Sequence, residues 1–177
     1  MKWIHEPGKW AEENDKIIVQ AEPGTDIWRQ PIEGGIRDSV HRYVEKIKGD
    51  FTASVRFKAD YAGLYDQVGL FVGLNDTVWM KCGVELVHNV KHASAVVTRG
   101  WSDWSIQALD DSEWVWIRVE RKDSMLFVYF SLDGEEYFLM RKAYFTDEKA
   151  LDVGIMAGSP KGKGFTAVFE GLTITAG

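Results

Sequence analysis

The sequence predicts an all-β fold, a sandwich of two antiparallel sheets. Segments that alternate apolar and polar residues recur along the chain, as half-buried strands require, and turn signals separate them at short spacing. Neither long helical periodicity nor the βαβ rhythm of a parallel sheet is visible. We therefore expect about ten or more strands joined by short turns.

Each strand is predicted from its local pattern. Alternation or a near-continuous apolar run is clearest in residues 51–57, 78–86, 114–121, 125–132 and 165–170. The Gly-rich segment 158–164 is a predicted loop. Residues 146–150 predict one helical turn, with Thr146 as its N-cap.

Short polar or glycine-containing pairs mark the reversals between strands. Turns are predicted at Asn75-Asp76, His88-Asn89 and Lys122-Asp123-Ser124. Asp133-Gly134 predicts a hairpin closed by a type I′ turn, because this pair accepts positive φ angles.

Composition limits the partners and the compartment. A chain of 177 residues predicts a single domain over residues 1–177. The net charge of −6 and the lack of a basic cluster argue against nucleic acid or an anionic membrane as partner. The N-terminal residues do not resemble a signal peptide, no stretch reaches transmembrane length, and Cys82 has no second cysteine to pair with. These features predict a cytoplasmic protein in which Cys82 is a small buried hydrophobe.

Catalytic and metal-binding patterns are weak. The closely spaced strand carboxylates of retaining glycosidases, a nucleophile elbow and an Asp-rich calcium loop do not occur. His88 and His92 flank a predicted hairpin and need not share a face. We therefore predict no catalytic residue, no metal ligand and no cofactor.

Alternation assigns side chains to faces. The predicted inward set is Val78, Met80, Cys82, Val84, Leu86, Val115, Ile117 and Val119. The predicted outward set is Trp79, Lys81, Gly83, Glu85, Trp114, Trp116, Arg118 and Glu120. Aromatic rings beside charged groups suit a polar, ring-shaped ligand, because the rings stack on apolar sugar faces and the charges bind hydroxyls. The alternative is ordinary cross-strand pairing on a solvated face.

Two tryptophans follow the turn at Gly100. Because Trp101 and Trp104 cannot easily both be core residues, we expect one of them at the edge of this outward face. Asp26-Ile27-Trp28-Arg29 has a similar mixture of residue types. The alternative is a packed loop tied by Asp103 to backbone amides.

An ordered series of motifs spans roughly residues 15 to 175. The motifs are Asp66-Gln67-x-Gly69-Leu70, Trp79-x-Lys81-x-Gly83-x-Glu85, Val97-Thr98-Arg99, Ser102-Asp103-Trp104-Ser105, Ser131-x-Asp133-Gly134 and Ser159-Pro160-x-Gly162. Together they resemble the "regulation of enolase" family of concanavalin A-like proteins, and Asp26-x-Trp28 and Arg37-Asp38 also fit its N-terminal part. The resemblance implies a jelly-roll sandwich, similar to the β-sandwich modules attached to some xylosidases, and no defined reaction.

The resemblance and the alternation indicate one groove on a concave sheet. Matched motif positions give the candidate ligand-binding residues Trp28, Gln67, Trp79, Lys81, Glu85, Thr98, Arg99 and Trp104, and alternation alone adds Trp116 and Arg118. Trp79 and Trp104 are expected to stack on a ring. Gln67, Lys81, Glu85 and Arg118 are expected to fix its polar groups, and Arg99 to brace Glu85 or bind an acidic sugar.

Three functions remain open. The first is lectin-like binding of a carbohydrate or similar polar ring. The second is a glycoside hydrolase or lyase using Glu85, whose pKa Lys81 is expected to lower so that the carboxylate acts as a base. The third is a protein-interaction or regulatory domain, with a homodimer through a sheet edge or face as a variant.

Overall fold

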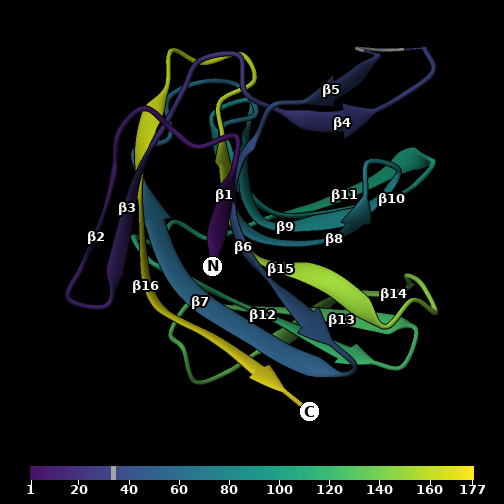
Figure 1. Ribbon diagram of the computed structural model, residues 1–177. Helices are drawn as coiled ribbons and strands as arrows, with labels where there is room; N and C mark the ends of the chain where they lie inside the picture. The colour runs from purple at the N-terminus through teal and green to yellow at the C-terminus, as the bar shows by residue number, and fades with distance from the viewer. Residues whose placement is uncertain (33–34) are drawn as a thin grey trace.

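The computed structural model describes residues 1–32 and 35–177, which fold into a jelly-roll β-sandwich. Two seven-stranded antiparallel sheets pack face to face, and a two-stranded ribbon lies over one of them (Figure 1). The predicted all-β class is confirmed. The described residues contain no helix, and so none that could cross a membrane.

Strand order defines the two sheets. The first sheet contains β1 (Lys2–Ile4), β6 (His41–Lys48), β15 (Ala150–Gly158), β8 (Gln67–Asn75), β9 (Val78–Val87), β10 (Val90–Arg99) and β11 (Trp101–Ala108), in that spatial order. The second sheet contains β14 (Phe138–Tyr144), β13 (Met125–Ser131), β12 (Val115–Lys122), β7 (Phe51–Ala59), β16 (Phe165–Ala176), β3 (Lys16–Ala21) and β2 (Trp10–Glu13). The ribbon consists of β4 (Ile27–Arg29) and β5 (Ile36–Asp38). β15 and β16, the last two strands of the chain, thus lie inside the sheets.

The main core fills the space between the two sheets. It contains most of the side chains that alternation assigned inward on β9 and β12, among them Met80, Cys82 and Ile117. Burial raises the pKa of the Cys82 thiol. Cys82 is therefore a small core hydrophobe, as predicted.

The predicted strand reversals form, but one of them differs in turn type. His88 and Asn89 both have positive φ, as a two-residue hairpin turn requires. The hairpin at Asp133-Gly134 forms, but residues 132–137 separate its strands, so the predicted type I′ turn is wrong. The reason is that Asp133 Oδ1 accepts hydrogen bonds from the N–H groups of Glu135 and Glu136, which organises a wider loop.

The helical turn predicted at 146–150 is also wrong. The Arg121 guanidinium donates to the backbone carbonyls of Thr146, Glu148 and Lys149. These carbonyls therefore point toward a buried side chain on β12 rather than along a helix axis. The Thr146 hydroxyl instead accepts the Glu148 N–H within a non-helical connection.

The outer face of the first sheet is concave and carries a second, smaller core. In Figure 1, β8, β9 and β10 bend around the space occupied by the β4–β5 ribbon. The buried members of this cluster are Ile27, Val40, Val44, Phe71, Trp79, Val96 and Met156. Trp28 packs against the cluster while remaining partly exposed. The ribbon is thus anchored on the concave face, and it forms one wall of the pocket described next.

Candidate functional site

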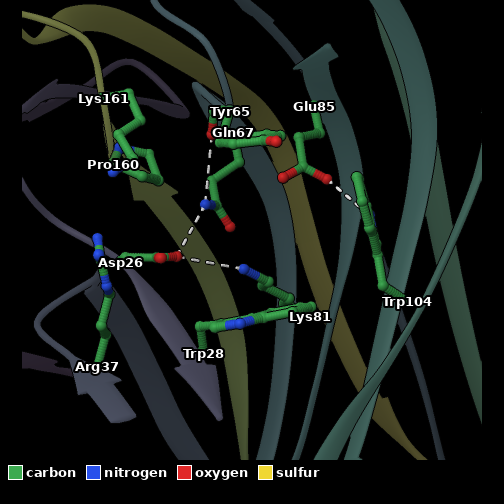
Figure 2. A pocket seen from close by; sticks show the side chains of 10 residues that line it. All are labelled: Asp26, Trp28, Arg37, Tyr65, Gln67, Lys81, Glu85, Trp104, Pro160 and Lys161. Atoms are coloured by element: carbon green, nitrogen blue, oxygen red, sulfur yellow. Dashed lines mark hydrogen bonds and ion pairs between the residues drawn. The ribbon is translucent and has the colours of Figure 1, made fainter. Parts of the chain in front are cut away.

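A pocket of about 370 Å³ opens on the concave face, between the ribbon and strands β8, β9 and β11 (Figure 2). Its size falls within the range typical of small-molecule sites. The pocket is lined by Asp26, Trp28, Arg37, Tyr65, Gln67, Lys81, Glu85, Trp104, Pro160 and Lys161. β9 contributes Lys81 and Glu85, which share a face because strand side chains alternate.

The Lys81 ammonium is held at one side of the pocket floor. Its Nζ donates to the Ile27 carbonyl at 2.9 Å and lies 3.5 Å from Asp26 Oδ1. Lys81 and Asp26 are both largely buried. A buried cation requires such partners, because an unpaired one would lose its hydration without compensation.

Gln67 presents a carbonyl oxygen to the pocket. Its Nε2 donates to Asp26 Oδ1 at 3.2 Å and to the Tyr65 carbonyl at 3.4 Å. Oε1 is buried and has no hydrogen-bond partner among the described residues. Figure 2 shows this oxygen turned toward the open space between Lys81 and Glu85. The floor therefore contains an unused acceptor.

Glu85 presents a second acceptor. Its Oε2 accepts hydrogen bonds from Ser94 Oγ at 2.8 Å and Trp104 Nε1 at 2.9 Å. Its Oε1 has no hydrogen bond to any described residue and points toward the pocket centre (Figure 2).

Burial is the largest influence on the Glu85 carboxyl and raises its pKa above the ordinary value, although Lys81, Ser94 and Trp104 act in the opposite direction. Lys81 acts in the predicted direction, but the expected net lowering of the Glu85 pKa is wrong. Removal of the carboxylate from water outweighs the attraction of an ammonium that is itself bound to Asp26 and Ile27.

Aromatic rings form the walls. Trp28 meets Trp104 at a centroid distance of 6.3 Å and 87°, and Tyr65 meets it at 6.1 Å and 82°. Figure 2 shows Tyr65 and Trp28 on opposite sides of the pocket, with Trp104 at its end. Two rings nearly perpendicular to the end wall leave a slot that suits a flat ring.

The floor has no side chains between its two polar ends. Gly69 on β8 pairs with Gly83 on β9, two residues along each strand from the Gln67–Glu85 pair. A Cβ atom on either glycine would lie 2.0 Å from a backbone oxygen of the neighbouring strand. Glycine is therefore required here by the close approach of the neighbouring backbone.

Two motif residues outside the pocket hold its loops. Asp66 is fully buried, and its carboxylate accepts hydrogen bonds from the N–H groups of Ala62 and Gly63 and from Ser159 Oγ. This links the loop that carries Tyr65 to the loop that carries Pro160. The Asp66-Gln67 and Ser159-Pro160 motifs thus have a structural reason in addition to any role in binding.

The structure brings together Trp28, Gln67, Lys81, Glu85 and Trp104 of the predicted set. Trp79 and Thr98 lie on the same face but are 1% and 0% exposed. Trp79 is covered within the smaller core, and the Thr98 hydroxyl contacts that of Ser102. The prediction that Trp79 stacks on a ligand is wrong, because the ribbon covers it.

Three predicted residues lie elsewhere. Trp116 and Arg118 are on β12 of the second sheet, so they cannot share a groove on the first. Arg118 is placed between the rings of Tyr129 and Tyr137, 4.9 and 4.3 Å from their centroids. Arg99 lies over Tyr144 of β14 and does not brace Glu85. Alternation identified outward positions correctly, but it cannot say to which sheet a strand belongs.

Sequence reasoning missed five lining residues. These are Asp26, Arg37, Tyr65, Pro160 and Lys161. Asp26 is two residues before Trp28, which was a predicted site residue, and Pro160 lies in the Ser159-Pro160-x-Gly162 motif. Both positions could therefore have been found from neighbouring residues in the sequence. Tyr65 has a φ of 68°, unusual for a non-glycine residue, which sequence does not display. Within the described residues, no group of three or more His, Cys, Asp or Glu is arranged to hold a metal.

The fold and the pocket define a jelly-roll protein with a candidate ligand site on its concave sheet. The chain belongs to the family described as protein of unknown function DUF1349, whose model matches residues 3–177. It is 33% identical over 175 residues to "Regulation of enolase protein 1" of Saccharomyces cerevisiae, covering 98% of this chain and 88% of the relative. The family resemblance inferred from the motifs is confirmed.

Solved structures agree with this assignment. A functionally unknown protein from Saccharomyces cerevisiae superposes with a TM-score of 0.95 at 32% identity, covering 99% of this chain and 96% of the other. More distant neighbours show the fold alone. A carbohydrate-binding module from Bacillus subtilis has a TM-score of 0.63 at 14% identity and coverage of 98% and 95%. A GH43 protein from Bacillus licheniformis has a TM-score of 0.72 at 14% identity, with coverage of 97% of this chain and 36% of that one.

Proposed function

We propose that this protein binds a carbohydrate, or a similar polar ring, in the concave pocket. The observation that carries the proposal is the combination of an aromatic slot with unused polar groups at its floor. Trp28, Tyr65 and Trp104 supply the rings, while Gln67 and Glu85 supply free oxygens. Sugars present apolar ring faces and hydroxyl edges, so they match both features.

The fold neighbours support this proposal without deciding it. The Bacillus subtilis module, named for carbohydrate binding, matches nearly the whole of this chain in fold. The relative from Saccharomyces cerevisiae has a name that refers to regulation. The geometry of the pocket therefore carries more weight than either name.

A second candidate is a glycoside hydrolase or lyase that uses Glu85. The observation that favours it is the buried carboxyl with a raised pKa inside the pocket. Such a carboxyl suits a general acid better than the base expected from sequence. A protein-interaction or regulatory role is the third alternative, and a blank sugar screen would favour it.

The test is a glycan-array screen of the protein beside two tryptophan variants. Trp104→Ala removes an aromatic wall and a hydrogen bond to Glu85. Trp101→Ala is the matched control, since Trp101 is on the same strand with its side chain 51% exposed and outside the pocket. We expect one sugar class to bind the wild type and Trp101→Ala, with loss in Trp104→Ala. Equal loss in both variants, or a blank array, would contradict the proposal.

Any sugar that binds is then tested for chemical change. Product formation that is lost in Glu85→Gln, with binding only weakened, would favour the enzyme. Unchanged sugar after long incubation with wild-type protein would favour the lectin-like function.

A further inference from the structure

We propose that the pocket selects an uncharged sugar that places two neighbouring hydroxyl groups against Gln67 and Glu85. This inference rests on the proposed function and states which chemistry the pocket recognises. It is carried by the orientation of two buried oxygens and by the partners that surround Lys81.

The Gln67 amide has one orientation that its partners allow. Asp26 Oδ1 and the Tyr65 carbonyl are both acceptors, so the nitrogen of the amide must face them. The oxygen then faces the pocket. Gln67 is 4% exposed, and its Oε1 has no partner among the described residues. A buried acceptor without a partner is unfavourable, so a ligand that donates there gains stability from satisfying it.

Glu85 provides the second contact at the right spacing. Gln67 and Glu85 are directly opposite each other on β8 and β9. Side chains of opposite residues on one face begin about 5 Å apart, so their ends can serve two adjacent groups of one ring. Ser94 and Trp104 occupy Oε2, which leaves Oε1 for the ligand.

Hydroxyl groups fit this pair in either protonation state of Glu85. A hydroxyl donates to a carboxylate oxygen, and it accepts a hydrogen bond from a protonated carboxyl. An ammonium can only donate, so it fits Glu85 Oε1 only when that carboxyl is ionised, and it would bring a second cation into the pocket that Lys81 lines. A carboxylate can only accept. Gln67 Oε1 always requires a donor, so a ligand carboxylate on this floor would face an oxygen it cannot bind.

Lys81 does not change this preference. Asp26 lies 3.5 Å from its ammonium, and the Ile27 carbonyl accepts one of its hydrogens at 2.9 Å. The cation is thus compensated before a ligand arrives, and it has a further hydrogen to donate to a hydroxyl oxygen. Lys161 lines the pocket from the loop that follows β15, where Figure 2 shows it beside Pro160 rather than beside Glu85.

The experiment is isothermal titration calorimetry with a defined panel. The probes are the methyl pyranosides of xylose, glucose, galactose and mannose, each with its single-position deoxy derivatives, and the matching uronates and amino sugars. We expect at least one neutral pyranoside to bind. Removing either of two adjacent hydroxyls should weaken it about tenfold or more, because each loss leaves a buried oxygen unpaired. The uronate of the same sugar should bind more weakly than the neutral parent.

Gln67→Met assigns one of the two hydroxyls. It keeps a similar side-chain length but removes the acceptor, so removal of the corresponding hydroxyl should no longer weaken binding. Gln107→Met on β11 is the matched control, because Gln107 is exposed and does not line the pocket. If Gln67→Met does not fold, the deoxy series on wild-type protein still decides the question.

The outcomes separate this inference from the proposed function. Preference for uronates or amino sugars, or neutral binding that is insensitive to every single deoxygenation, would overturn the inference and leave carbohydrate binding standing. Lack of binding by every probe, together with a blank array, would overturn both.

Discussion

Glu85 shows how burial and hydrogen bonding compete at a single residue. Its carboxyl is removed from water, which raises its pKa, while Lys81, Ser94 and Trp104 favour the ionised form without reversing the shift. The group is held on the floor of a pocket rather than sealed in a core. A buried carboxyl on a pocket floor is available to a ligand. Its raised pKa also makes the free energy of unfolding of the ligand-free protein depend on pH.

The direction of this pH dependence follows from the raised pKa. A carboxyl whose pKa is raised in the folded protein is protonated in both states below its unfolded pKa, where the free energy of unfolding is highest. The free energy of unfolding then falls as pH rises through the folded pKa, because the unfolded state ionises more readily. The free energy of unfolding of wild type should therefore fall relative to that of Glu85→Gln as pH rises from about 4. The loss is about 1.4 kcal/mol for each pH unit between the two pKa values.

Urea unfolding of both proteins between pH 4 and 8 checks this expectation. Glu45→Gln is the control, because Glu45 lies on β6 outside the pocket. Parallel curves for wild type and Glu85→Gln would show that the pKa of Glu85 is not raised in the folded protein.

At the scale of elements, the β8–β9 pair determines the pocket floor. Gly69 and Gly83 are paired at a point where the backbone of the neighbouring strand leaves no room for a Cβ atom. Their neighbours Gln67 and Glu85 stand on one side of this glycine pair along the strands, and Lys81 stands on the other. The same pair of strands therefore positions the three polar groups.

Gly83→Ala should disturb this arrangement. The added methyl would lie 2.0 Å from the Val68 carbonyl oxygen, and backbone cannot yield as a flexible side chain can. We expect the free energy of unfolding to fall by about 1–3 kcal/mol or more, as for other overpacked sites, with loss of sugar binding. Gly8→Ala is the control, because its methyl would meet only the end of the Glu22 side chain. Thermal or urea unfolding that is equal for Gly83→Ala and wild type would contradict the close approach.

Sequence predicted what is local in these elements. The period of two sorted β9 and β12 correctly into inward and outward positions, because alternation depends only on neighbouring residues. Sequence could not assign β12 to the second sheet, so Trp116 and Arg118 were placed in the wrong groove. It also could not show that β4 and β5 fold over Trp79, since that contact joins segments distant in the chain.

At the scale of the whole molecule, the main hydrophobic core and the candidate binding pocket lie on opposite faces of the first sheet. The main core lies between the sheets, whereas the pocket lies on the concave face turned away from it (Figures 1 and 2). The ribbon and the two loops joined by Asp66 and Ser159 complete the walls. The second sheet carries its own aromatic and cationic residues, among them Trp114 with Arg56 at 4.7 Å. These residues offer a competing surface on which a sugar ring can stack, so the location of binding is the central question.

The most direct measurement is a titration of ¹⁵N-labelled protein, followed through the indole N–H signals, with the sugar that the array identifies. We expect saturable shifts for Trp28 and Trp104 with one common Kd, while Trp114 and Trp116 remain unchanged. Saturable shifts of Trp114 and Trp116 without a change at Trp104 would place binding on the second sheet and overturn the concave pocket as the binding site.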